Sequence, residues 1–270
     1  MDNFDLDKIN FGIEIEFTGI NRLTAASLIS GYFKTTCTRK IQTFEIESMN
    51  GSIWRLVRDS SIGPEGVQQM YSDLYKNELI TPICNIADIN AILDLVELLK
   101  ENGGIANDSC GLHVHVGAEI HSTCSLSNML VFWIKHQRIF TDYFKTNQSS
   151  LDKYCQYLPD KMLDFLLSSE TLSEETLKSI WYEGYEERPA KYNKSRYRTM
   201  NLNTLYTIGT IEYRIGKGSL DSRYILEYLK FCLFINKKAL EDKNIRYELF
   251  DSMDEIYEYL GLKIDLDHES

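Results

Sequence analysis

Two short segments of the chain alternate apolar side chains with charged ones, which is the pattern of a β-strand buried on one face. Residues 11–17 read Phe-Gly-Ile-Glu-Ile-Glu-Phe, and residues 111–116 read Gly-Leu-His-Val-His-Val. Because successive side chains of a strand point to opposite faces, the charged groups of each segment share one face, while the isoleucines and valines can pack on a core. The side chains on the polar faces are Glu14, Glu16, His113 and His115.

A third segment repeats this alternation. Residues 210–215 read Thr-Ile-Glu-Tyr-Arg-Ile, which puts Glu212 and Arg214 on one face. Three strands that each bury one face and put charge on the other predict a single sheet. We expect its polar face to be a site rather than a solvated surface.

The remaining segments predict an α+β architecture. Residues 41–48 and 52–58 are strand-like, and the Asn50-Gly51 pair between them predicts a hairpin with a type I′ turn. Apolar residues recur at helical spacing elsewhere, so we expect an antiparallel sheet with helices on its outer face. The predicted helices are 24–34, a segment after Asp88, 125–144, two segments within 160–182 capped by Asp160 and Ser173, 221–240 and 248–260.

Length and composition allow one large cytoplasmic domain or two small ones. With 270 residues, 43% of them hydrophobic, the chain can bury a substantial core, so we expect residues 1–270 to form a single domain with the helices of 221–260 packed on the sheet. The net charge of −11 argues against a general nucleic-acid binder. No segment has the length and composition of a signal peptide or a membrane span, so no membrane partner is expected. The six cysteines include no Cys-x-x-Cys pair and are expected to be reduced thiols of a cytoplasmic protein.

Five side chains of the charged segments predict a site for a divalent cation. Carboxylates that face one space repel each other, and Mg²⁺ or Mn²⁺ relieves that repulsion. Nearby arginines would then fit a polyphosphate, because metal and guanidinium groups can share its oxygens. Such an arrangement is typical of phosphoryl transfer. The candidate ligands are Glu14, Glu16, Glu78, Glu212 and His113, and the arginines are Arg196, Arg198 and Arg214.

Each motif taken alone has a simpler interpretation. A Glu-x-Glu strand is most often one solvated face of a sheet, the basic run 188–198 is most often a solvated loop, and Asp59 is most often a turn residue. Cys110 with His113 and His115 also leaves a zinc hydrolase open, although no second Cys/His pair completes a tetrahedral site. The prediction depends on the joint occurrence of the motifs.

The order of these motifs resembles that of the amidoligase family, the carboxylate–amine ligases related to glutamine synthetase and glutamate–cysteine ligase. Residues 11–17 are similar to the family's opening Gly-x-Glu-x-Glu strand, and residues 110–116 resemble its Gly-x-His-x-His strand. The resemblance runs in family order from residue 11 to about residue 220. The other matching segments are 59–62, 78–82, 196–203 and 210–214.

The resemblance implies an antiparallel sheet that forms an open glutamine-synthetase-like funnel, with ATP entering from one end. It also implies roles for individual residues. The metal ligands would be Glu14, Glu16, Glu78, His113 and Glu212. The nucleotide would be bound by His115, Arg196, Arg198, Asn201 and Asn203. The catalytic residues would be Arg214 and Arg198, joined by Arg196, which neutralise the transferring phosphoryl group, and Asp59, which positions either the incoming amine or a metal-bound water.

The implied activity is that of an ATP-dependent carbon–nitrogen ligase with Mg²⁺ or Mn²⁺ as cofactor. ATP would phosphorylate a carboxylate, and an amine would displace phosphate from the acyl phosphate to give an amide. The partners would be a small-molecule or peptide carboxylate and an amine donor, and a monomer or simple dimer is expected. Two alternatives keep the fold: a phosphagen-kinase-like phosphotransferase and a non-catalytic nucleotide-binding module.

Overall fold

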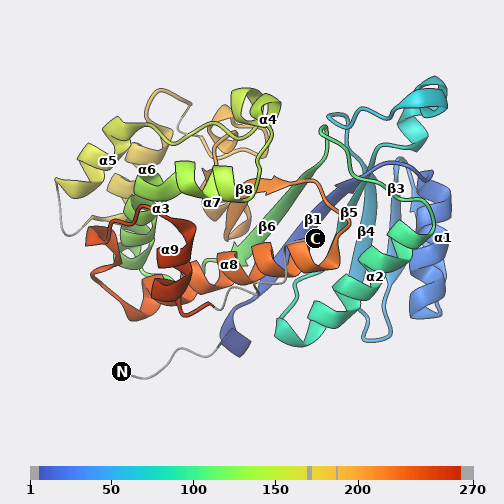
Figure 1. The fold of residues 1–270 in the computed structure, drawn as a ribbon, viewed down its shortest axis with the longest axis horizontal. Coiled ribbons are helices and arrows are strands. Elements are labelled where there is room, and N and C mark those ends of the chain that lie inside the picture. The colour runs from blue at the N-terminus through green and yellow to red at the C-terminus, as the bar shows by residue number, and fades with distance from the viewer. Residues whose placement is uncertain (1–5, 169–171, 187, 263–270) are drawn as a thin grey trace. The chain divides into compact units, whose positions relative to one another are not determined.

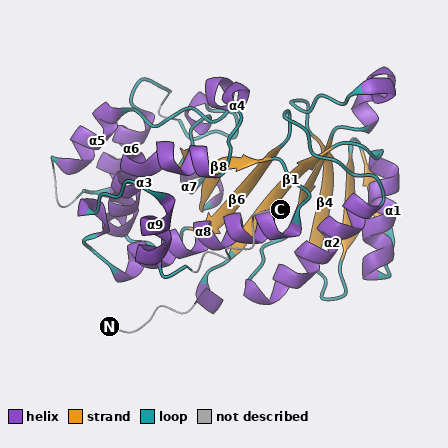
Figure 2. Ribbon diagram, viewed as in Figure 1, coloured by secondary structure: helices purple, strands orange, loops and turns teal. Residues whose placement is uncertain are grey.

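The computed structural model describes residues 6–168, 172–186 and 188–262, and it combines an eight-stranded sheet with helices (Figures 1 and 2). The strands are β1 Phe11–Phe17, β2 Cys37–Lys40, β3 Thr43–Glu47, β4 Ile53–Arg58, β5 Asn77–Ile80, β6 Gly111–Gly117, β7 Met200–Asn201 and β8 Thr210–Lys217. Their order in the sheet is β2-β3-β4-β5-β1-β6-β8-β7, and the β1–β5, β2–β3, β3–β4, β4–β5 and β7–β8 pairs are antiparallel. The expected mixture of helices with an antiparallel sheet is confirmed, whereas the funnel shape stays a prediction.

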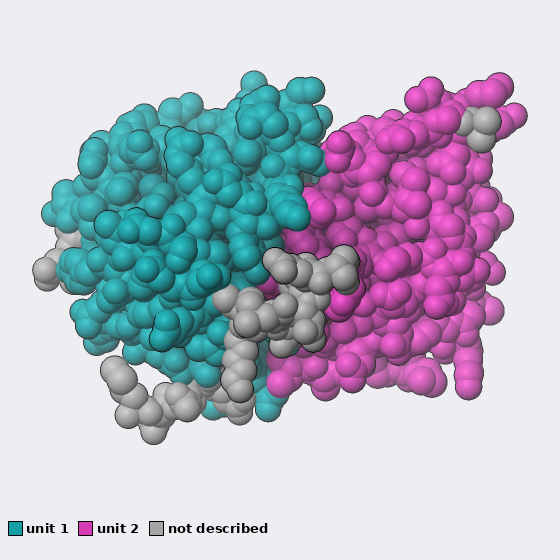
Figure 3. Space-filling model, viewed as in Figure 1, with its two compact units in different colours: residues 1–9, 116–215, 229–270 teal, residues 10–115, 216–228 magenta. Residues whose placement is uncertain are grey.

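The chain divides into two compact units (Figure 3). Unit 1 comprises residues 1–9, 116–215 and 229–270, and unit 2 comprises residues 10–115 and 216–228. Each unit is therefore assembled from segments that are far apart in sequence. The expectation of one domain over 1–270, with the helices of 221–260 packed on the sheet, stays a prediction.

Unit 2 has an apolar sheet face that helix α1 (Arg22–Phe33) covers. In the strand register, Ile15 lies opposite Leu79, Leu79 opposite Leu56, and Leu56 opposite Phe44. Residues directly opposite each other share a face, so this row forms one continuous apolar surface. The four side chains are all buried. The alternate residues of the same strands must then lie on the other face, which carries the charged groups.

The hairpin between β3 and β4 is present, but its turn is not type I′. A type I′ turn needs positive φ at both central residues, and only Gly51 has it, at 83°. Ser48 and Ser52 instead close a three-residue loop, because the Ser48 amide donates to the Ser52 carbonyl at 2.9 Å. The strand expected to begin at residue 41 starts at Thr43, since Ile41 is 94% exposed in the turn that follows β2.

Unit 1 is built largely from helices that pack around α3 (Thr123–Tyr143). Trp133 and Phe140 of this helix pack against each other and against Phe231 in tilted and edge-to-face contacts, which gives the unit an aromatic core. The other helices of the chain are α2 Ile89–Glu101, α4 Gln148–Lys153, α5 Asp160–Leu167, α6 Glu174–Tyr182, α7 Leu205–Ile208, α8 Ser222–Glu241 and α9 Met253–Leu260. Short 3₁₀ helices are η1 Leu6–Lys8, η2 Gly66–Leu74, η3 Ile86–Asp88, η4 Lys194–Arg196 and η5 Ile245–Tyr247.

The predicted helix caps had mixed outcomes. Ser173 caps α6, accepting a hydrogen bond from the Thr176 amide at 3.1 Å. Asp160 is wrong as a cap, because Pro159 occupies that position and Asp160 is the first helical residue. Within the predicted range 160–182, residues 169–171 lie outside the described residues. None of the described helices combines the length and apolar composition that a membrane crossing requires.

Candidate active site

The polar face of the unit 2 sheet carries a cluster of carboxylates and imidazoles, which we call the acidic cluster. Glu16 of β1 lies directly opposite Glu78 of β5, so their β-carbons face each other across the strand pair. Glu14 follows on the same face two residues earlier. The members of the acidic cluster are Glu14, Glu16, Glu78, His113 and His115.

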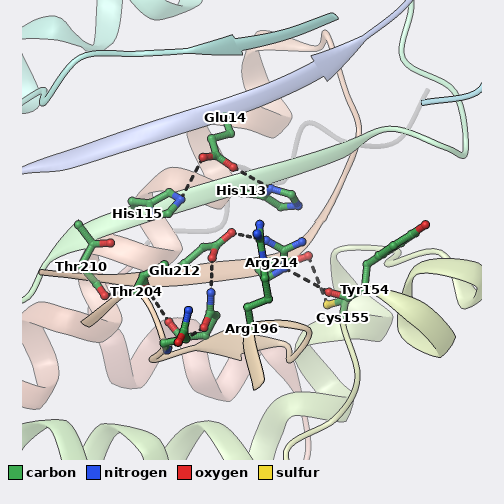
Figure 4. Close-up of polar contacts among 12 residues, drawn as sticks. Glu14, His113, His115, Tyr154, Cys155, Arg196, Thr204, Thr210, Glu212 and Arg214 are labelled. Atoms are coloured by element: carbon green, nitrogen blue, oxygen red, sulfur yellow. Dashed lines mark hydrogen bonds and ion pairs between the residues drawn. The ribbon is translucent and has the colours of Figure 1, made fainter. Parts of the chain in front are cut away.

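Glu14 lies between the two histidines of β6 (Figure 4). Its Oε2 is 3.2 Å from His113 Nδ1, and its Oε1 is 3.4 Å from His115 Nε2. Glu16 is held by the backbone, since its Oε2 accepts a hydrogen bond of 2.7 Å from the Gly111 amide. The sequence prediction that these alternating side chains share one face is therefore confirmed.

Two glutamates of the cluster have pKa values displaced in opposite directions. Burial acts to raise the pKa of Glu14, but His115 and His113 outweigh it and hold that pKa well below its usual range. Burial, followed by the charges of Glu14, Glu16 and Asp59, raises the pKa of Glu78 well above its usual range. The cluster thus contains more carboxylates than its own histidines can neutralise.

The acidic cluster includes a set of atoms that fits a divalent cation. Glu16, Glu78 and His113 each offer one ligand atom, and these atoms lie within 4.8 Å of one another. Oxygen ligands with one imidazole suit Mg²⁺ or Mn²⁺, and a bound cation would relieve the repulsion that raises the pKa of Glu78. The donor set therefore fits the predicted metal.

The zinc alternative has less support. Cys110 lies beside Asn107, with its Sγ 3.6 Å from Asn107 Oδ1, and burial raises the pKa of its thiol to about 12. The polar contact of this thiol is thus with Asn107 rather than with the histidines of β6. Among the described residues, the groups that could hold a metal contain no cysteine. His121 lies in a loop and contacts Ser125 and Asn236.

Asp59 closes the turn after β4. Its Oδ1 accepts hydrogen bonds from the backbone amide of Ser61, at 2.6 Å, and from the Ser61 hydroxyl. The turn interpretation of Asp59 is therefore supported. Its charge also raises the pKa of Glu78, so it acts electrostatically on the acidic cluster.

Unit 1 contains a second set of predicted site residues, a buried ion pair between Arg214 and Glu212 on β8 (Figure 4). Arg214 Nη1 contacts Glu212 Oε1, and the two residues are only 7% and 2% exposed. The second carboxylate oxygen of Glu212 accepts a hydrogen bond from the Asn201 amide group. Arg214 also donates through Nε to the Tyr154 carbonyl at 3.2 Å. Both oxygens of Glu212 are thus satisfied by unit 1 itself.

Of the predicted nucleotide residues, Asn201 contacts this ion pair directly, and Asn203 contacts Asn201. Asn201 Oδ1 accepts from the Asn203 amide at 2.8 Å. Asn203 in turn accepts from the Tyr182 hydroxyl at 2.7 Å and donates to the Ala190 carbonyl at 3.0 Å. These contacts hold the residues after β7 against Tyr182 and Ala190, and they engage both asparagines with protein groups.

The two remaining arginines are held by aromatic rings. Arg198 is buried and donates to the Trp181 carbonyl at 2.9 Å, with its guanidinium 4.4 Å from the Trp181 ring centre and 5.1 Å from that of Tyr185. Arg196 lies over the rings of Tyr192 and Tyr197. The tyrosine content of residues 182–197 is the sequence signal for these contacts.

Two supporting residues had no sequence signal. Tyr154 serves Arg214 through its backbone carbonyl, which any residue could supply, and Trp181 serves Arg198 in the same way. The prediction that Glu212 shares a metal with Glu14 and His113 joins residues of different units, and it stays a prediction.

Comparison with known proteins agrees with the order of the motifs. No curated protein is similar enough to the chain to be matched with it. A family model described as "putative amidoligase enzyme" matches residues 7–236, which include the acidic cluster and the Arg214–Glu212 pair. The match covers most of the 270 residues. The chain therefore belongs to the amidoligase family.

Proposed function

We propose that this protein is an ATP-dependent carboxylate–amine ligase that forms an amide through an acyl phosphate. The observation that carries the proposal is the acidic cluster, in which buried carboxylates face one another without enough cationic groups to neutralise them. A cluster of this kind is stabilised by divalent cations. Within a family of amidoligases, such cations are expected to serve a polyphosphate cosubstrate.

Glu16, Glu78 and His113 are the residues that would hold Mg²⁺ or Mn²⁺, and Glu14 would keep the two imidazoles oriented. When bound, the cation supplies charge neutralisation for phosphate oxygens. His113 can act as a ligand only when one ring nitrogen carries no proton, and its contact with Glu14 selects the tautomer. The carboxylates of Glu16 and Glu78 accept no proton from the substrate in this proposal.

Arg214 is the residue that we propose neutralises the transferring phosphoryl group. Its guanidinium is already oriented by Glu212 and by the Tyr154 carbonyl, so little rearrangement is needed during the reaction. Arg198 would add positive charge, and Asp59 would position the incoming amine with the carboxylate oxygen that Ser61 does not use. His115, Asn201 and Asn203 remain proposed nucleotide residues, the asparagines acting through the geometry of β7 and the residues that follow it.

The test is calorimetric titration with a non-hydrolysable ATP analogue, with and without Mg²⁺. We expect binding only with Mg²⁺ and its loss in Glu14→Gln, without unfolding. Glu45→Gln is the matched control, because Glu45 occupies the same cross-strand row as Glu14 but is paired with Lys40 and Arg55. Normal Mg²⁺–nucleotide binding by Glu14→Gln would show that Glu14 does not support the metal site, and normal binding by Glu16→Gln as well would show that the metal assignment is wrong.

A phosphate-release screen of acids against amines then tests the reaction. Phosphate release that depends on both an acid and an amine, with an amide as product, supports the ligase. A stable phosphorylated product without an amide would support the phosphotransferase alternative. Nucleotide binding without any turnover across the screen would support the non-catalytic module.

A further inference from the structure

A cationic segment of unit 1 has properties that the proposed reaction does not use. Residues 188–198 contain five lysines and arginines and no acidic residue, in a chain with a net charge of −11. None of these cations forms an ion pair with a carboxylate of a described residue, and all of them except the buried Arg198 are at least partly exposed. Because an acidic protein repels anions in general, an unpaired cationic segment attracts them to one place. These four cations are Arg188, Lys191, Lys194 and Arg196.

Arg196 is held in one orientation, and we call its arrangement the arginine anchor. Its guanidinium carbon lies 5.9 Å from the ring centre of Tyr192 and 5.6 Å from that of Tyr197, and its Nη1 donates to the Lys191 carbonyl at 3.0 Å. The other N–H groups of Arg196 have no acceptor within the described part of the chain. A guanidinium fixed in this way presents a ready donor edge to an oxyanion.

The arginine anchor lies close to Arg214. The Tyr197 ring packs edge-on against the Tyr154 ring, with 5.9 Å between their centres, and the Tyr154 carbonyl accepts from Arg214 Nε. In the view of Figure 4, Arg196 extends toward Arg214. The contact between Tyr197 and Tyr154 therefore links the anchor to the residue whose carbonyl holds the Arg214 guanidinium.

The segment around the anchor is open rather than enclosed. Tyr192 is 76% exposed, and Arg188, Lys191 and Lys194 are exposed as well. Cations spread along an exposed segment suit an extended ligand with several negative charges better than a single small anion. The exposed tyrosine face can also cover the apolar part of such a ligand.

We propose that the arginine anchor binds a second carboxylate of the acyl substrate, and that this substrate is a short acidic peptide. The inference rests on the proposed function in one respect, namely that an acid is activated beside Arg214. It moves Arg196 from the nucleotide, where the sequence resemblance put it, to the acid. The chemistry that the anchor recognises is an oxyanion, which a nucleotide phosphate also supplies, so the test has separate arms for the two.

The experiment is calorimetry of the full chain at low ionic strength with tetraglutamate, and with tetraglutamine as the uncharged peptide. The wild-type chain is expected to bind tetraglutamate and not tetraglutamine. Arg196→Gln should weaken tetraglutamate binding about tenfold or more, because it removes a charged hydrogen-bond donor. Tyr192→Ala should weaken it about threefold, since the guanidinium loses one of its two rings.

Lys230→Gln is the matched control, because it removes one exposed positive charge from α8 of the chain. It should change tetraglutamate binding less than about twofold if the anchor is specific. Arg196→Lys keeps the charge but not the planar donor edge, so its affinity should lie between those of Arg196→Gln and the wild type. An unchanged thermal midpoint of each variant excludes unfolding as the cause.

Three results would overturn the proposal. Wild-type protein could fail to distinguish tetraglutamate from tetraglutamine, or Lys230→Gln could lose as much affinity as Arg196→Gln. Arg196→Gln could also weaken the Mg²⁺–nucleotide analogue as much as the peptide, which would return Arg196 to the nucleotide. Failure of the proposed function looks different, because the nucleotide analogue would then not bind at all while tetraglutamate binding stayed dependent on Arg196.

Discussion

The Arg214–Glu212 pair of unit 1 and the acidic cluster of unit 2 hold similar residues under opposite electrostatic conditions. Glu212 is buried, yet its two oxygens are met by Arg214 and Asn201. In the acidic cluster, Glu78 faces Glu16 and lies near the charge of Glu14, and its pKa is raised well above the usual range. One carboxylate is neutralised by an arginine, whereas no lysine or arginine of the described residues forms an ion pair with the other.

This difference separates two uses of buried charge. A carboxylate that the protein neutralises orients its arginine partner. Its oxygens can bind a metal only if the carboxylate and the arginine move apart. A carboxylate that the protein does not neutralise reduces stability, and that loss is recovered when a cation binds. The comparison predicts that the two clusters respond in opposite ways when one charge is removed.

The largest effect is expected for Arg214→Met, which leaves Glu212 buried and charged. We expect this variant to lose about 3–5 kcal/mol of unfolding free energy. The double variant Arg214→Met/Glu212→Leu should recover much of the loss, because it removes the stranded charge as well. Urea unfolding measures the free energy of unfolding of the single and the double variant. A single variant as stable as the wild type would mean that the pair is not desolvated.

The next effect concerns His121, whose hydrogen-bonding contacts Ser125 and Asn236 are neutral, unlike the Glu14 partner of the histidines on β6. Its Nε2 lies 2.9 Å from Asn236 Oδ1, and burial lowers its pKa to about 4. The folded state therefore binds its proton less readily than the unfolded state does. Stability is fully present above about pH 6.5 and falls by about 2 kcal/mol as the pH drops toward 4.

The variant His121→Gln should lack this part of the acid sensitivity. Urea unfolding of wild type and variant at pH 7, 5.5 and 4.5 measures it as a difference in slope. Parallel pH profiles would show that His121 is not buried in its neutral form.

A smaller effect of opposite sign is expected for Glu78→Gln. Removing one of the crowded carboxylates should raise the stability of the metal-free protein by about 1–2 kcal/mol at pH 7. The raised pKa means that the folded wild type loses stability as the pH rises above the usual pKa of a glutamate, because Glu78 resists ionisation in the folded state. The gain in stability from Glu78→Gln should therefore be smaller at pH 5 than at pH 7. The thermal midpoint in the absence of metal measures this gain.

The same variant should lose the stabilisation that Mg²⁺ gives to the wild type. Glu45→Gln, on the same sheet face, should keep it. A wild-type midpoint that does not rise with millimolar Mg²⁺ would contradict the metal site.

The smallest effect is expected at Asp59, whose charge acts on the acidic cluster by raising the pKa of Glu78. Asp59→Ala removes the acceptor for two Ser61 donors and should reduce stability by about 1 kcal/mol. Asp59→Asn keeps an acceptor and should be nearly neutral. Thermal unfolding compares them, and equal losses in the two variants would mean that the negative charge, not the turn, matters.

The sequence predicted the strands and their polar faces well, because period-two alternation is a local property of the chain. Glu14 and Glu16 share a face, as expected, and so do the two histidines of β6. The turn type was wrong because Asn50-Gly51 permits both a two-residue and a three-residue loop, and the strand register decides between them.

The site was less predictable where backbone atoms provide the contacts. Tyr154 and Trp181 hold arginines through carbonyl groups, which leave no mark in the side-chain pattern. The pairing of Arg214 with Glu212 was open to prediction, since two residues separated by one along a strand share a face. The Asn201 side chain donates a hydrogen bond to Glu212, and this contact follows from the pairing of β7 with β8, which the sequence pattern does not specify.

The order in which segments join unit 2 has a consequence for synthesis on the ribosome. Its first 106 residues, 10–115, are translated long before residues 216–228, whose Gly218 amide donates to the Cys110 carbonyl at 2.9 Å. At typical translation speeds the intervening hundred residues take about 5–20 s. During that interval the nascent acidic cluster exists in an unfinished unit, so a chaperone that shields this intermediate should raise the yield of folded protein.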